Sequence, residues 1–146
     1  MVNVLIQEDW EEGDDPGMNM WRVPGADGVM LVAADVTSWT LKVYDLTVDP
    51  TVGIVPDSNS SGTANSNNFR TFNSLQVGDG FWSKDDIGYN LRHYVNNADL
   101  TSTPFKAGHT YLFVYKVLTS AFSGSSGDFG QITLQRRGTC RGAGGL

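Results

Sequence analysis

Cysteine and long apolar runs are scarce in this chain, and each scarcity excludes a class of protein. Cys140 is the one cysteine, so no internal disulfide can support the fold. No segment approaches the ~18 consecutive apolar residues of a membrane-spanning helix, so no membrane partner is expected. Residues 1–9 lack the basic start and long apolar core of a signal peptide. We therefore expect a protein that is made in a cytoplasm and is not exported by that route.

Basic residues are also few. The 146 residues include 10 Lys and Arg against 16 Asp and Glu, which gives a formal net charge of −6. Nucleic acid is not expected as a main partner, because phosphate contacts need clustered basic side chains. Arg136, Arg137 and Arg141 form the one basic cluster, near the C-terminus. We interpret this cluster either as a tail that reaches a negatively charged neighbour or as a solvated chain end.

The chain does contain many short segments with the two-residue period of β-strands. Trp39, Leu41 and Val43 alternate with more polar residues, which is typical of an antiparallel sheet with one solvated face. Residues 111–118 are apolar on both faces apart from Lys116, as in a central strand. For residues 69–75, a helical turn and an irregular strand both remain open. The length and spacing predict one all-β domain over 1–146, a sandwich or barrel of about seven to eight strands.

Three segments are expected to lie outside the packed core. Residues 1–17 are predicted to form an extended N-terminal arm, which includes six carboxylates between positions 8 and 15. Residues 57–68 contain no large apolar side chain, so we expect a mobile loop, or one that is ordered only against a partner. Residues 136–146 are predicted to form a flexible C-terminal tail.

The residues that could carry chemistry do not form a convincing catalytic or cofactor site. Adjacent carboxylates such as Asp85 and Asp86 normally point apart, whereas a glycosidase needs two that face each other. The acidic stretch at 8–15 could bind Ca²⁺ weakly, although it lacks the ligand spacing of an EF-hand. His93 and His109 have no Cys or Glu at ligand spacing, and we expect both to be half-buried. No enzyme activity, metal or cofactor is predicted.

Aromatic residues leave one alternative open. Trp10, Trp82, Tyr89 and other aromatic side chains could stack on sugar rings, but aromatic residues also dominate cores and interfaces. Trp39 shares the phase of its apolar neighbours and is predicted to be core. Trp82 follows a glycine turn, so we expect it to be exposed.

The order of these segments resembles a known family. Residues 106–115 place a glycine turn before an alternating aromatic strand, as the late strands of immunoglobulin-like sandwiches do. Together with residues 4–9, 38–45, 75–93 and 111–115, this layout resembles the small immunoglobulin-like proteins that tailed bacteriophages encode among their head and tail genes. The resemblance implies an immunoglobulin-like antiparallel β-sandwich in a virion accessory protein, and it transfers no residue-level binding site.

These observations lead to one main hypothesis and two alternatives. The main one is a non-enzymatic bacteriophage capsid decoration or cement protein that binds the major capsid protein or another virion protein, assembled in the bacterial host cytoplasm, with a trimer as one possible oligomer. The alternatives are a neck, tail or baseplate component and a module that binds host-surface carbohydrate. The expected partner contacts are an unpaired edge strand, exposed aromatic residues and the basic cluster, that is Val2, Val4, Ile6, Trp10, Trp82, Tyr89, Arg136, Arg137 and Arg141.

Overall fold

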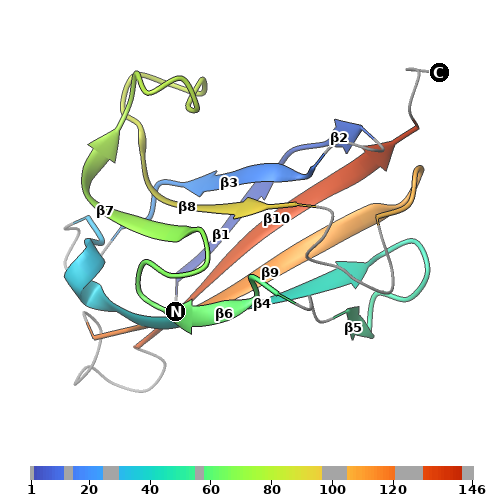
Figure 1. Ribbon diagram of the computed structural model, residues 1–146, viewed down its shortest axis with the longest axis horizontal. Helices are drawn as coiled ribbons and strands as arrows, with labels where there is room; N and C mark the ends of the chain where they lie inside the picture. Colours follow the sequence, from blue (N-terminus) through green and yellow to red (C-terminus); the bar gives the residue numbers. More distant parts are fainter. Residues whose placement is uncertain are drawn as a thin grey trace.

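Two β-sheets packed face to face make up the part of the chain that the computed structural model describes, residues 2–11, 15–24, 30–54, 58–96, 105–120 and 130–142 (Figure 1). The seven-stranded sheet has the order β1 (Val2–Gln7), β10 (Gln131–Arg141), β9 (Thr110–Thr119), β4 (Val36–Asp45) and β5 (Gly53–Ile54). In addition, β2 (Trp10–Glu11) pairs with β10, and β6 (Ser61–Thr63) pairs with β4.

The second sheet has three strands in the order β3 (Gly17–Trp21), β8 (Tyr89–Val95) and β7 (Phe69–Gln76). A short 3-10 helix, η2 (Ala33–Asp35), leads into β4. The strands β1 and β2 run parallel to β10, whereas all other strand pairs are antiparallel. The prediction of an all-β chain is confirmed, and no helix in the described part is long and apolar enough to cross a membrane.

The two-residue period of β4 and β9 positions the core between the sheets. Trp39, Leu41 and Val43 are buried, as predicted, and β9 is a central strand with β10 on one side and β4 on the other. Aromatic rings connect the two sheets, because Trp39 on β4 stacks on Phe69 of β7 with ring centroids 4.7 Å apart. Packed rings of this kind contribute about 0.5–1.5 kcal/mol each beyond the area that they bury.

The strand count differs from the prediction for a simple reason. Ten strands are described instead of seven or eight, because β2, β5 and β6 are only two or three residues long. The irregular strand, and not the helical turn, is the correct alternative for residues 69–75. In β7 the register with β8 shifts between Thr71 and Gln76.

The prediction of a structureless loop at 57–68 is wrong for its described part, 58–68. This segment carries β6 and is ordered by short polar side chains in place of apolar ones. Asn59 donates to the carbonyl of Tyr94 at 2.7 Å, and Asn67 donates to the carbonyl of Ser61 at 2.9 Å. Asparagine side chains bond readily to nearby backbone and tolerate left-handed turns, so they can order a loop without burying apolar surface.

The predicted N-terminal arm and C-terminal tail are also wrong for the described residues. Residues 2–7 and 10–11 are strands of the seven-stranded sheet, residues 17–21 form β3, and residues 136–141 belong to β10. The two ends order each other, because β1 and β2 pair along the same side of β10. Residues 12–14 and 143–146 lie outside the described part.

Candidate binding surfaces

The strand β1 forms an edge of the seven-stranded sheet. It pairs with β10 through six consecutive residues, and in the described part of the chain no strand lies on its other side. Leu5 faces outward and is 55% exposed, whereas Ile6 packs against the core. Ile6 is therefore a half-buried core contact and not an exposed side chain of this edge. Val2 and Val4 lie in register with Ile132 and Leu134, and their side chains lie outside the described part.

The expected basic cluster is divided between two environments. Arg137 and Arg141 are exposed, and Arg141 forms a 3.0 Å ion pair with Asp9. Arg136, in contrast, is fully buried and stabilises the fold. Its guanidinium donates to the carbonyls of Glu8 and Pro16, and thereby holds the segment that joins β1 to β3. The prediction of Arg136 as a partner contact is wrong, because in β10 it alternates inward with Leu134.

Trp10 is likewise buried and not a surface contact. Its ring lies 5.2 Å from that of Phe105 and 5.8 Å from those of Tyr111 and Phe113. The guanidinium of Arg136 lies 5.0 Å from the Trp10 ring centroid, so a cation–π contact joins the two. A tryptophan within an acidic stretch suggested exposure, but the pairing of β2 with β10 turns this side chain into the core.

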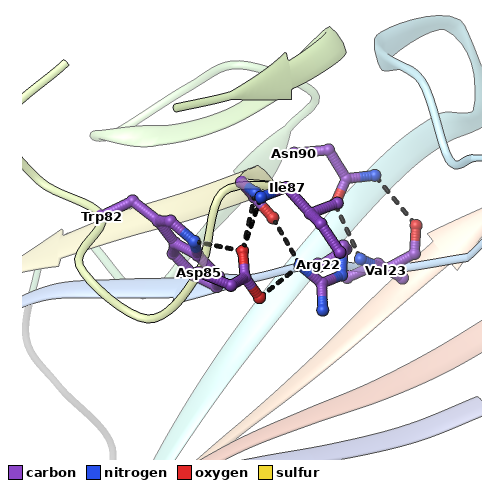
Figure 2. Close-up of polar contacts among 7 residues, drawn as sticks. Arg22, Val23, Trp82, Asp85, Ile87 and Asn90 are labelled. Atoms are coloured by element: carbon purple, nitrogen blue, oxygen red, sulfur yellow. Dashed lines mark hydrogen bonds and ion pairs between the residues drawn. The ribbon is translucent and has the colours of Figure 1, made fainter. Parts of the chain in front are cut away.

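Trp82 belongs to the loop between β7 and β8, which is organised by one carboxylate (Figure 2). Asp85 accepts hydrogen bonds from the indole of Trp82 at 2.9 Å and from the backbone N–H groups of Ile87 and Gly88 at 2.9 and 3.0 Å. Its second oxygen accepts from Arg22 at 2.7 Å. Together the Gly88 amide, the Trp82 indole and the Arg22 guanidinium hold the pKa of Asp85 well below its usual range.

A second polar contact beside this loop anchors β8. Asn90 accepts from the N–H of Val23 at 2.7 Å and donates to the carbonyl of Val23 at 2.9 Å (Figure 2). It also donates to the carbonyl of Leu31 at 2.8 Å. Asn90 is fully buried, and its amide supplies hydrogen bonds to the backbone of Val23 and Leu31 as a strand partner would. The loop therefore ends at a strand, β8, that these buried hydrogen bonds hold in place.

Trp82 and Tyr89 do not form the exposed sugar-stacking pair that the sequence suggested. Tyr89 is fully buried, and its hydroxyl donates to Asp79 and accepts from Arg92 at 3.0 Å. Trp82 is half-buried and packs 5.6 Å from the Tyr89 ring. The apolar side chains that this loop does expose are Val77, Phe81 and Ile87, at about half of their surface each.

Replacing Asp85 by asparagine should loosen this loop. The amide retains one acceptor oxygen but loses the charge that strengthens the bonds from Ile87, Gly88 and Arg22. We expect faster hydrogen exchange at the amides of Ile87 and Gly88 in Asp85→Asn than in the wild type. The neighbouring exposed Asp86→Asn is the matched control and should exchange like the wild type; equal protection in both variants would contradict the role given to Asp85.

His93 is fully buried, not half-buried as the sequence suggested, and lies in a chain of polar groups between the sheets. Its Nδ1 lies 2.7 Å from the hydroxyl of Tyr115, and its Nε2 lies 2.8 Å from the side-chain oxygen of Asn59. Asn19 donates to the same Tyr115 hydroxyl at 2.6 Å and also accepts from Arg136. Burial lowers the pKa of His93 to about 3, so the ring is neutral near pH 7.

This polar chain is buried at Asn19, His93, Tyr115 and Arg136, and Asn59 at its end is half-buried. By contrast, His109 is half-buried, as predicted, and its Nδ1 lies 2.7 Å from a carboxylate oxygen of Asp45.

The described residues contain no group of three or more His, Cys, Asp or Glu side chains that could hold a metal ion. Tyr89 lies in phase with Leu91, and Arg136 lies in phase with Leu134, so the two-residue alternation is the sequence signal that could have located both in the interior.

A scan against protein-family models found no match, and searches of the curated proteins and of the solved structures found no significant match either. The interpretation of these surfaces therefore depends on their own geometry.

Proposed function

We propose that this chain is a non-enzymatic structural protein of a bacteriophage particle, with an immunoglobulin-like fold, that decorates or cements the capsid. The strand order supports the fold. With β3, β4, β7, β8, β9 and β10 taken as strands B, C, D, E, F and G, the sheets have the orders B-E-D and G-F-C, and β5 adds a strand beside C. These orders support an immunoglobulin-like arrangement, in which variable-type domains add strands beside C.

A tyrosine near the start of β9 also supports this fold. The hydroxyl of Tyr111 accepts a hydrogen bond of 2.8 Å from the backbone N–H of Lys106, which fits the tyrosine corner of immunoglobulin-like domains. Antibody domains carry a disulfide cysteine two residues after this tyrosine, and here that position is Phe113. Its ring packs against the rings of Trp10 and Phe105.

The observation that carries the function is the open edge at β1. Monomeric proteins usually blunt an edge strand with charged residues, proline or a covering segment. Residues 2–7 read Val-Asn-Val-Leu-Ile-Gln and contain neither a charged residue nor proline. These six residues of extended backbone, of which Leu5 is exposed, can accept a strand from another protein. The resemblance to phage accessory proteins makes the capsid lattice the proposed partner.

A charged residue on this edge should weaken particle binding. We expect Leu5→Lys to lower the amount of protein that sediments with capsids, because the ammonium group must lose water wherever the edge is covered. Val48→Lys introduces the same residue at a site that is 70% exposed in the turn after β4, and it should bind like the wild type. Equal loss in both variants would argue against docking through β1.

The number of copies in a purified particle tests the proposal more directly. Quantitative mass spectrometry of particles of the encoding virus, normalised to the major capsid protein, should give a copy number in the hundreds. A few dozen copies or fewer would point to the neck, tail or baseplate. Absence from the particle would overturn the virion role.

A further inference from the structure

Two arginines lie directly opposite each other on neighbouring strands. Arg70 on β7 and Arg92 on β8 are register partners on the outer face of the three-stranded sheet, since Phe69 and Thr71 of β7 and Leu91 and His93 of β8 are buried. Like charges at directly opposite positions destabilise a sheet. Among the described residues, neither arginine takes part in an ion pair. The repulsion between these two side chains therefore needs an explanation.

Aromatic rings hold both guanidinium groups in place. Arg70 and Arg92 lie over the ring of Phe72, at 5.4 and 5.1 Å from its centroid, and Arg92 also lies 5.3 Å from the centroid of Phe81. A guanidinium that stacks on a ring keeps its N–H groups, which point outward in its own plane, available for hydrogen bonds. Arg92 uses Nη1 to donate to Tyr89, whose hydroxyl also contacts Asp79.

The two arginines line a pocket of about 320 Å³ on the outer face of this sheet. Asn65, Asn68 and Tyr94 contribute polar groups to its wall. Asn65 and Asn68 both adopt positive φ angles, of 55° and 65°, in the turn before β7. The side-chain oxygen of Asn65 accepts from the N–H of Thr71 at 2.8 Å, which fixes this turn against β7. Arg70 and Arg92 thus line this pocket together with two asparagines of an ordered turn.

We propose that this pocket binds a tetrahedral oxyanion, a phosphate or sulfate group. A carboxylate has two oxygens and is satisfied by a single guanidinium fork, whereas a phosphate or sulfate offers enough oxygens for two forks and an asparagine amide. Its double negative charge also matches the two arginines and removes their repulsion. This site goes beyond the proposed capsid role, since it lies on the three-stranded sheet and β1 belongs to the other sheet.

Isothermal titration calorimetry with inorganic phosphate, sulfate and acetate, at constant ionic strength, tests this site. We expect saturable binding of phosphate or sulfate and none of acetate. Arg70→Gln should weaken the binding at least about tenfold, because one charged fork is lost. Arg70→Lys keeps the charge but not the two-pronged guanidinium, so its affinity should lie between those of the wild type and Arg70→Gln. Arg137→Gln removes the same charge from the exposed face of β10 and should leave the affinity unchanged.

Each remaining outcome also decides the question. No binding to the wild type, or equal weakening by Arg70→Gln and Arg137→Gln, would overturn the site. Acetate that binds as tightly as phosphate would replace the tetrahedral oxyanion by a general anion site and overturn the proposed class. Glucose 6-phosphate separates the two sources of the group: binding as tight as that of inorganic phosphate supports a phosphate carried on a larger molecule, and loss of binding supports the free ion.

Discussion

Replacing Arg136 by methionine is expected to lower the free energy of unfolding by about 3 kcal/mol or more. The guanidinium is buried and donates at 2.7–3.2 Å to the carbonyls of Pro16 and Glu8, and it also donates to Asn19. Methionine fills similar space but leaves these oxygens without the guanidinium donor, and the Pro16 and Asn19 oxygens are in buried positions. The cation–π contacts with Trp10 and Phe113 are lost as well. Urea unfolding, followed by tryptophan fluorescence, measures the difference.

The adjacent residue provides the control for this variant. Arg137→Met removes the same charge one position along β10, where the side chain is exposed, and its effect should stay within about 0.5 kcal/mol. If Arg137→Met were as destabilising as Arg136→Met, the loss would come from net charge and not from the buried contacts. A stable Arg136→Met variant would show that the N-terminal segment is held by its strand pairing alone.

Acid should destabilise the protein through His93. The unfolded imidazole has a pKa of about 6.5, and burial lowers the folded value to about 3. Between these values the unfolded chain binds the extra proton, so the stability contribution of His93 is fully present above pH 6.5. It falls by up to about 1.4 kcal/mol for each pH unit as the pH drops toward 3.

The comparison with a His93→Gln variant isolates this contribution. Glutamine cannot titrate, so its plot of unfolding free energy against pH should be flatter than that of the wild type between pH 6 and pH 4. The difference between the two plots removes the part due to carboxylates, which titrate in both proteins. Parallel plots would mean that His93 becomes protonated in the folded state without cost.

The sequence predicts those parts of the fold that depend on periodicity alone. The alternation of Trp39, Leu41 and Val43 identified the buried face of β4, and the apolar run at 111–118 identified the central strand. Such patterns report burial directly, because every second side chain of a half-buried strand must be apolar. They say nothing about partners in the sheet, so the parallel pairing of β1 with β10 could not be inferred.

Polar residues account for most of the errors. Arg136 looks like part of a charged tail, because its buried acceptors are backbone carbonyls that composition does not reveal. Residues 58–68 look structureless for the same reason, since asparagine side chains and not apolar ones order them. Tyr89 was expected to be a surface contact beside Trp82, whereas it is buried with the rings of Trp82 and Phe72 packed against it.

The pairing of the first strand with the last has a consequence for how the chain reaches this fold. Arg136 and the carbonyl that it holds at Glu8 are 128 residues apart in sequence. Contacts between such distant residues form late, because the loop that they close costs entropy before any packing compensates for it. During synthesis the uncharged residues of β1 have no strand partner until β10 has left the ribosome. We therefore expect slow folding, and the edge that we propose as a partner site is the segment most exposed to wrong pairing during folding.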